Sequence, residues 1–428
     1  MFEKVILAFK LPDLRRKIFF VLAILVVFRL VAAIPVPGVE PGRLASFLAG
    51  NQFFGLLNIF SGGVLENLSI VMLGVGPYIT ASIIMQLLTM IFPRLKEMYQ
   101  EEGEAGRAKF NQYSRFLTVP LALLQAYGLL VILVRQQILV PTAGQEVFWY
   151  VTNMVTVTAG TIFLMWLGEL ITEKNIGNGV SLLIFAGIIS RLPVDLRQAF
   201  LARNPFEDPS VIPLYLAFTA VSIAVISGVV IITEGQRNIP VSYAKRVRGN
   251  RVFGGVETHL PLRVNQAGVI PIIFAISIIL FPGLIGNFLA TVPNDIVQRA
   301  SAFLIGLLNN QWLYGVLYFL LVFLFTYFYT AVTFDPNAIA TNIQKQGGFI
   351  LGMRPGRPTS EFLQRILNRI TLFGGLFLGA IAILPLAVQA GFGLSALTVG
   401  GTSLLIVVSV VLETLKQINA QLVMHEYE

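Results

Sequence analysis

The chain has 428 residues, of which 56% are hydrophobic and only 12% are charged, and its formal net charge is +8. Soluble domains carry about 25% charged residues, so a water-soluble fold, a coiled coil, a collagen-like rod and a disordered chain are excluded, and the solvent of this protein is lipid. Cysteine is absent and histidine occurs only twice, which excludes disulfides and thiolate sites and argues against a histidine-based metal or catalytic centre.

Ten apolar segments follow one another along the chain and predict an all-α membrane protein with ten transmembrane helices. Most have the roughly 20 residues that cross about 30 Å of hydrocarbon. The fifth is short, and we expect residues 193–202 to complete it. The predicted spans are Ile18–Ile34, Ser69–Phe92, Phe116–Val134, Phe148–Leu170, Val180–Leu192, Ile212–Thr233, Ala267–Leu289, Trp312–Phe334, Ile370–Val388 and Leu397–Leu415.

Basic residues set the predicted orientation of these spans. With the N-terminus in the cytoplasm, 23 of the 30 Lys and Arg residues fall in inner segments, six fall in outer segments, and Arg29 lies inside the first span. Such a bias toward one side of the membrane sets the topology. We therefore predict a multi-pass protein whose two termini are both cytoplasmic.

Two octapeptides in different spans resemble each other. Gly74–Ala81 in the second span and Gly268–Ala275 in the seventh share Gly, Val, Pro, Ile and Ala in register. Each is the second span of a five-span half, and an odd number of spans gives the two halves opposite topology. Inverted repeats with broken helices in matching positions build central pathways through membranes. We predict two inverted five-helix halves, 1–202 and 203–428, around a central pore.

Three segments outside the spans differ from ordinary loops. Residues 53–66 are apolar but too short and glycine-broken to span, so they either re-enter the membrane under the protection of protein or lie flat as an interfacial helix. On the predicted cytosolic side, the long basic loops 234–266 and 335–368 project where a soluble partner can reach them.

The spans lack the ionisable residues that other classes of membrane protein need. All five Asp residues lie outside the predicted spans, whereas proton- and ion-coupled transporters bury such groups within the membrane. No cluster suits an enzyme, and no charge ring suits a selective ion channel. A polypeptide channel and a secondary transporter for a small solute both stay open, and the lack of charge together with the two basic loops favours the channel.

Several long motifs, in order from the first span to the last, resemble the SecY family of protein-conducting channels. They are Phe60–Gly63, Gly76–Leu88, Met165–Glu169, Gly177–Gly179, Thr258–Leu262, Asn265 with Gly268–Pro271, Gly352–Gly356 and Gly400–Ile406. The resemblance implies a clam-shaped bundle around an hourglass pore, which opens laterally between spans two and three on one side and seven and eight on the other.

The same resemblance implies a function and partners. The chain would be the central, passive subunit of a translocation channel in a bacterial inner membrane, with neither enzymatic activity nor a cofactor. Unfolded polypeptides would cross it, and apolar segments would leave it laterally into the lipid bilayer. The implied partners are the small subunits SecE and SecG, the SecA motor or a ribosome, and signal sequences and nascent polypeptides.

The predicted seal is a ring of branched aliphatic side chains. Val75 and Ile79 lie one helical turn apart and share a face, and the repeat aligns Ile273 with Ile79. Ordinary core- or lipid-facing positions are the alternative interpretation, and the Gly/Pro breaks favour the ring. With the residues that the resemblance adds, the ring is Val75, Ile79, Val180, Ile184, Ile273 and Ile406, and the plug resting on it is Phe60, Ser61, Gly62, Gly63, Val64 and Leu65.

Two further sets of polar residues are candidates for a lateral gate and for docking. Gln86 and Asn265 belong to the cytosolic side of the predicted topology and could hydrogen-bond across the gate, with Thr80 deeper, although ordinary helix–helix contacts would look the same. Arginine in the two basic loops presents donors suited to carboxylates or RNA phosphates, or else serves topology alone. The predicted docking residues are Lys245, Arg246, Arg248, Arg251, Arg354 and Arg357.

Overall fold

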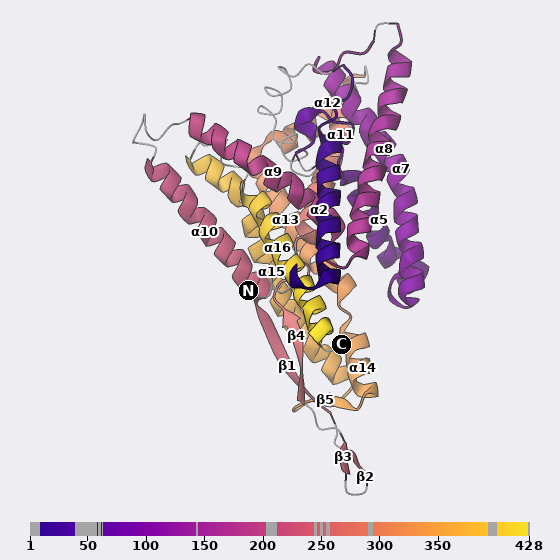
Figure 1. The fold of residues 1–428 in the computed structure, drawn as a ribbon, viewed down its shortest axis with the longest axis vertical. Coiled ribbons are helices and arrows are strands. Elements are labelled where there is room, and N and C mark those ends of the chain that lie inside the picture. Colours follow the sequence, from indigo (N-terminus) through magenta and orange to yellow (C-terminus); the bar gives the residue numbers. More distant parts are fainter. Residues whose placement is uncertain are drawn as a thin grey trace.

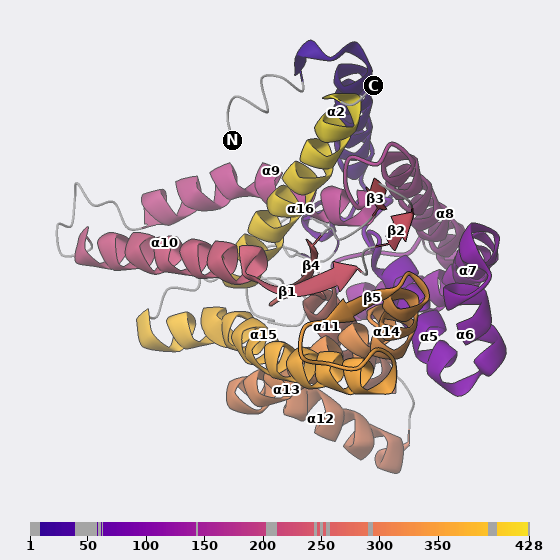
Figure 2. The ribbon, with the colours of Figure 1, turned by 90° about the horizontal axis from the view of Figure 1, so that it is seen from below.

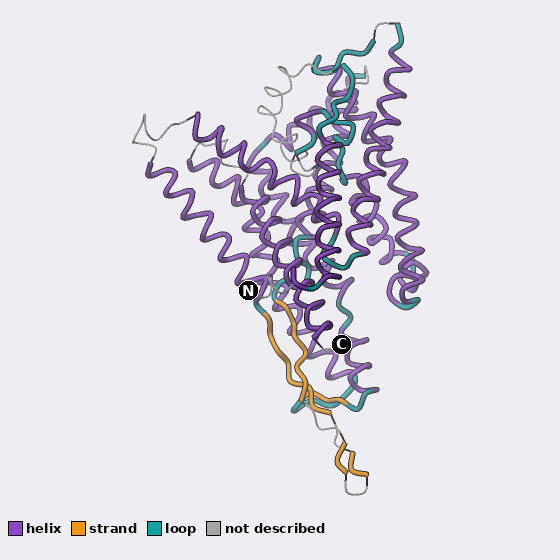
Figure 3. Tube along the Cα trace, viewed as in Figure 1, coloured by secondary structure: helices purple, strands orange, loops and turns teal. Residues whose placement is uncertain are grey.

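Helices dominate the computed structural model of the chain (Figures 1 and 3). It describes residues 9–38, 58, 61, 63–142, 144–202, 212–243, 246–248, 251–253, 257–289, 294–392 and 400–426. Each of the ten predicted spans overlaps a helix. These helices are α2 (Pro12–Ala32), α5 (Gly76–Ile91), α7 (Gly103–Arg135), α8 (Glu146–Glu173), α9 (Gly179–Ala202), α10 (Ile212–Glu234), α11 (Ile270–Leu289), α13 (Gln311–Thr333), α15 (Arg357–Phe392) and α16 (Gly400–Glu426). Helix α5 begins at Gly76, seven residues after Ser69, the predicted start of the second span.

Length and composition differ among these ten helices. Within the described residues, six helices are long and apolar enough to cross a membrane on their own, and α5 makes a seventh when it is joined to the short α6 (Pro93–Gln100) across a bend of 113°. The bend falls where proline disfavours helical backbone at the residue before it, and Phe92 is accordingly extended. Shorter apolar stretches lie in α9 and α11, and α2 carries five charged residues.

The two octapeptides adopt the same backbone pattern. Their first glycines, Gly74 and Gly268, have φ of +58° and +62°, a left-handed conformation that only glycine adopts without cost. A helix begins two residues after each of them, with proline as its second residue. The chain before α5 is further held to the end of α2, because the Ile70 N–H donates to Ile34 O at 3.0 Å. The sequence repeat is therefore a repeat of local structure.

The two basic loops fold together into a small sheet. Strand β1 (Gln236–Tyr243) pairs antiparallel with β4 (Glu257–Arg263) on one side and with β5 (Gly348–Ile350) on the other. Burial alternates along β1, where Ile239 and Val241 are buried, and their side chains pack with Ile343 of α14 (Pro336–Lys345). Figure 1 shows this unit at one end of the helical bundle. The sequence predicts loops over both segments, whereas the structure forms strands there.

One central cluster of buried apolar side chains lies among α2, α5, α8, α9, α10, α11, α13, α15 and α16. It includes T-shaped aromatic packing between Phe274 and Phe325, whose ring centroids are 5.8 Å apart, and the fully buried Tyr318. A second cluster joins α7 and α8 to the segment before α5. Because helices from both predicted halves line the central cluster, the middle of the bundle is apolar and closed.

Candidate functional site

Five of the six predicted ring residues belong to the central cluster and are nearly inaccessible to solvent. The sixth, Val180, is half-buried and packs against that cluster. The exposed fractions of the five buried residues are Val75 3%, Ile79 6%, Ile184 2%, Ile273 6% and Ile406 0%. The structure thus gathers, from four helices of both halves, side chains that lie up to 331 positions apart in the sequence.

Most of the ring comes from the first turns of helices. Val75 caps α5, and the Ile79 N–H donates to Val75 O at 3.0 Å, which places the two side chains one turn apart on one face. Ile273 occupies the matching turn of α11, where its N–H donates to Val269 O at 3.2 Å. Glycine and proline breaks at these positions therefore direct the helix starts into the centre.

The start of α9 is in close contact with the neighbouring helix α8. The Gly179 N–H donates to the Thr172 hydroxyl of α8 at 2.9 Å. A Cβ at Gly179 would collide with the backbone of Gly168, also on α8, so only glycine permits this approach. The close packing of α8 and α9 carries Val180 and Ile184, in the first turns of α9, into the central cluster.

The described plug residues fold inward. Phe60 and Gly62 lie outside the described residues, but Ser61, Val64 and Leu65 are at most 4% exposed, and Val64 belongs to the same central cluster as the ring. Gly63 packs toward α9, where an ideal Cβ would lie 3.5 Å from the Arg191 Cδ. An interfacial helix lying flat on the membrane would expose such side chains to lipid or water.

One contact joins the plug directly to the ring. Gly74, the residue before Val75, faces the backbone of Ser61, because a Cβ built on Gly74 would lie 2.6 Å from the Ser61 Cα. The Ser61 hydroxyl donates to Asn58 O at 3.0 Å, which closes the turn that contains the plug. The glycine at position 74 is therefore required both by its positive φ and by the presence of the plug.

The predicted gate residues bond within their own segments. The Thr80 hydroxyl donates to Gly76 O at 3.0 Å, the Gln86 amide nitrogen lies 3.5 Å from the Ser82 hydroxyl, and the Asn265 amide nitrogen donates to Gly268 O at 3.1 Å. Gln86 and Asn265 do not bond to each other. Their amide oxygens, Oε1 and Oδ1, are buried without a partner among the described residues.

We call the contact surface of α5 and α7 with α11, together with the contact of α6 with α13, the seam. The polar bond that crosses it is not predicted from the sequence. Gln100, the last residue of α6, donates from its amide nitrogen to the Val332 carbonyl near the end of α13, at 3.1 Å. No local signal identifies a partner that lies 232 positions away.

A second polar connection between the halves involves α16. The Gln421 amide nitrogen donates to Asn175 O at 2.6 Å, in the turn between α8 and α9. The Lys17 ammonium of α2 donates to Gln421 Oε1 at 3.3 Å. Within residues 203–428, Lys416 also pairs with Glu234 at the end of α10, at 2.9 Å. The end of α16 therefore holds the first half at a place away from the seam.

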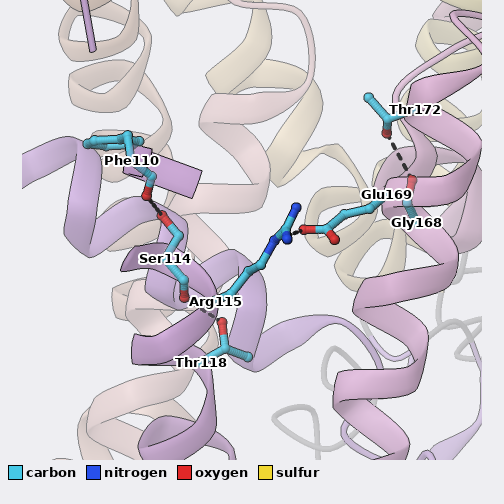
Figure 4. Close-up of polar contacts among 7 residues, drawn as sticks. All are labelled: Phe110, Ser114, Arg115, Thr118, Gly168, Glu169 and Thr172. Carbon is cyan, nitrogen blue, oxygen red and sulfur yellow. Dashed lines mark hydrogen bonds and ion pairs between the residues drawn. The ribbon is translucent and has the colours of Figure 1, made fainter. Parts of the chain in front are cut away.

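Within the first half, α7 and α8 are joined by an ion pair. Arg115 Nε lies 2.6 Å from Glu169 Oε1 (Figure 4). The two side chains are 48% and 20% exposed, so the pair contributes at most about 1 kcal/mol. Along α7, the Ser114 hydroxyl donates to Phe110 O and the Thr118 hydroxyl donates to Ser114 O, so these buried hydroxyls are satisfied within the helix.

The described docking residues lie in a two-stranded hairpin separate from the sheet of β1, β4 and β5, and in the turn and helix start that follow β5. Lys245 lies outside the described residues. Strands β2 (Arg246–Arg248) and β3 (Arg251–Phe253) pair antiparallel, with Arg248 opposite Arg251. Arg354 is exposed in the turn that follows Gly352, and Arg357 pairs with Glu361 on the surface of α15 at 3.1 Å. Because β1 pairs with both β4 and β5, the two basic loops form one projecting unit.

Comparisons with known proteins agree along the whole chain. The SecY family model matches residues 69–415. The protein translocase subunit SecY of Corynebacterium glutamicum is 46% identical, and the alignment covers 99% of this chain and 98% of that protein. The corresponding subunit of Mycobacterium tuberculosis is 42% identical, with 100% of this chain and 99% of that protein covered.

Three solved structures share the fold at low sequence identity. A protein conducting channel has a TM-score of 0.62 and 19% identity, with 94% of this chain and 91% of that chain covered. Sec61 in the canine ribosome-channel complex has a TM-score of 0.61, 19% identity and the same coverage. A SecY structure that concerns stabilisation of the closed state by the plug domain has a TM-score of 0.59 and 21% identity, with 93% and 90% covered.

Proposed function

Because the chain belongs to the SecY family and is the channel subunit of a protein translocase, we propose that polypeptides cross the membrane through the ring of Val75, Ile79, Val180, Ile184, Ile273 and Ile406. The protein is a multi-pass membrane channel and not an enzyme. The observation that carries the proposal is that five of these side chains lie in one central cluster together with Val64 of the plug, and that Val180 packs against the same cluster. Family membership decides against the alternative of a small-solute transporter.

The ring seals the resting channel by its chemistry. Branched aliphatic side chains offer nothing to replace the hydration shell of an ion, so a narrow ring of them resists ions by dewetting. The same side chains make no directional contacts and let a passing chain slide. The plug, residues 53–66, closes the ring from one side, and the inward contact of Ser61 with Gly74 supports this role.

The seam is the lateral gate through which apolar segments leave for the bilayer. Residues 1–202 and 203–428 are the two inverted halves that part there, which the shared backbone pattern at Gly74 and Gly268 supports. Gln86, Asn265 and Thr80 lie in or beside the seam helices, and the unpaired amide oxygens of Gln86 and Asn265 leave the closed seam weakly held. An arriving apolar signal helix then competes successfully for the same surface.

The projecting sheet unit is the docking site for the partner that drives transport. We assign this partner as the SecA motor or a ribosome, and SecE and SecG as small subunits bound within the membrane. The likeness to a channel in a ribosome complex supports the first assignment. The bacterial relatives and the distribution of basic residues support placement in a bacterial inner membrane with both termini cytoplasmic.

Conductance in planar bilayers tests the ring. We expect the double variant Ile184→Ser and Ile406→Ser to leak ions, because hydroxyls wet the constriction, and deletion of residues 60–65 alone to give a smaller leak. The matched control is the double variant Ile189→Ser and Val411→Ser on the same two helices. These two aliphatic side chains are 40% and 38% exposed. A ring variant as ion-tight as the control, with the plug removed, would show that the pore lies elsewhere.

Motor-driven export tests the docking unit. We expect Arg354→Glu to abolish export driven by the purified motor in proteoliposomes, while the channel still inserts into the membrane, because the reversed charge repels an acidic docking surface. The control is Arg365→Glu on α15, which lies outside the turn and the predicted docking set. Normal export by the Arg354 variant would contradict this docking surface.

A further inference from the structure

The helix α12 (Asp295–Asn309), between α11 and α13, carries apolar surface that the described part of the protein does not cover. Ile296 is 79% exposed and Phe303 is 69% exposed. With 3.6 residues per turn, Ile296, Ala300 and Phe303 fall on one face of the helix. A single exposed apolar side chain is ordinary, but a continuous exposed apolar face on one helix needs a partner or a solvent that suits it.

A different face of α12 packs against α11. The buried Ser301 hydroxyl donates to Gly286 O of α11 at 2.6 Å. A Cβ at Gly286 would lie 3.3 Å from both the Leu304 Cβ and the Ile305 Cγ1, so glycine lets the two helices approach closely. The contact with α11 therefore accounts for Ser301, Leu304 and Ile305 and leaves the Ile296–Phe303 face uncovered.

The third face of α12 is exposed and carries the charges of the helix. Asp295 and Arg299 lie one turn apart, and the small Ala302 follows them on the same face, so no large apolar side chain stands there. The helix start is exposed as well, and Asn294 caps it by accepting the Ile296 N–H at 3.0 Å. A helix with one apolar and one charged exposed face suits a membrane–water interface, where the apolar face contacts lipid and the charged face contacts water.

The helix that follows α12, the membrane span α13, carries exposed apolar surface as well. Along α13, a stripe at four-residue spacing begins at Trp312, which is 83% exposed, and runs through exposed aliphatic residues. The stripe consists of Trp312, Val316, Leu320 and Leu324. Tryptophan concentrates at the boundary between hydrocarbon and headgroups. Figure 1 shows α12 at the end of the bundle opposite the strands, and Figure 2 shows it at the periphery beside α13.

We propose that α12 lies in the interfacial layer of the bilayer, with the Ile296–Phe303 face inserted at the boundary between headgroups and acyl chains. Its charged face, with Asp295 and Arg299, remains in water. The occupant of the uncovered surface is thus lipid rather than a protein subunit. Because Ser301 bonds to Gly286, the interfacial helix also fixes the level of that end of α11 in the membrane.

The absence of cysteine from the chain makes a direct test possible. Single cysteines at Ile296, Phe303, Asp295 and Ala302 are spin-labelled in the full chain, in liposomes of phosphatidylcholine and phosphatidylglycerol. The two positions on each face have the same spacing along the helix, so the faces are compared at matched places. Collision rates are then measured with oxygen, which concentrates in the membrane, and with a water-soluble nickel chelate. All four positions are exposed, so the substitutions leave the packing against α11 intact.

We expect the ratio of oxygen to nickel collisions to be severalfold higher at Ile296→Cys and Phe303→Cys than at Asp295→Cys and Ala302→Cys. Equal ratios at all four positions would place α12 wholly in water and overturn the proposal. Low collision rates with both reagents at Ile296→Cys and Phe303→Cys would overturn it too, because they would show that protein covers this face.

Discussion

The centre and the seam of this protein are held closed by different kinds of interaction. The centre is closed by buried aliphatic side chains, which pack without directional bonds, and by a plug whose Ser61 backbone rests on Gly74. The seam has apolar packing too, and Gln100 donates a hydrogen bond to Val332 across it, while the amide oxygens of Gln86 on α5 and of Asn265 just before α11 are buried without a partner among the described residues. For the proposed pore and the proposed lateral gate, the difference predicts that the two routes are controlled separately.

Alanine substitution at the glycines of the repeat is expected to have the largest effect, and it acts on the centre and not on the seam. Gly74 and Gly268 have nearly the same positive φ, so alanine costs about 1–2 kcal/mol of backbone strain at either position. At Gly74 the added Cβ also meets the Ser61 backbone, whereas at Gly268 nothing lies within 4 Å. We therefore expect Gly74→Ala to lower the thermal unfolding temperature more than Gly268→Ala, and to make the resting channel leak ions.

Gly268→Ala is the matched control, because it carries the strain without the collision. We expect this variant to remain ion-tight in planar bilayers. Equal leaks in the two variants would mean that backbone strain alone opens the channel and that the plug contact does not hold the centre closed.

Loss of the hydrogen bond from Gln100 to Val332 across the seam is expected to have the second-largest effect. Gln100→Ala removes one neutral hydrogen bond, a loss of about 0.5–1.5 kcal/mol, so we expect a less hydrophobic signal sequence to suffice for insertion. The measurement is insertion efficiency across a series of signals of graded hydrophobicity. As a control, Gln364→Ala removes an exposed glutamine whose bond to Asn368 stays within α15, and it should leave the threshold unchanged. A threshold unaffected by Gln100→Ala would show that this bond does not hold the seam.

Interactions that are local in sequence were predictable, and those between distant segments were not. Composition alone locates the ten spans, because each apolar run forms its own helix. The Gly-Pro breaks likewise mark the starts of α5 and α11, so Ile79 and Ile273 could be assigned to matching turns. Ile184 and Ile406 depended on resemblance, because no spacing rule relates α9 to α16.

The missed features depend on partners far along the chain. Val241 pairs with Ile350 across more than 100 residues, and the short β5 carries no strand signal of its own. The predicted contact between Gln86 and Asn265 was plausible from topology alone. In the structure each amide donates instead to a group in its own segment, since side chains of this type readily bond to nearby groups.

The smallest effect concerns the two unpaired amide oxygens at the seam. Replacing Gln86 or Asn265 with leucine removes a buried acceptor that has no partner and adds apolar packing to the closed state. Polar contacts between membrane helices average only about 0.6 kcal/mol, so the change is modest. We expect either variant to require a more hydrophobic signal for insertion, which is opposite in sign to Gln100→Ala. The double variant Gln86→Leu with Gln100→Ala should therefore lie near the parent. A threshold unchanged in both leucine variants would mean that these oxygens do not weaken the seam.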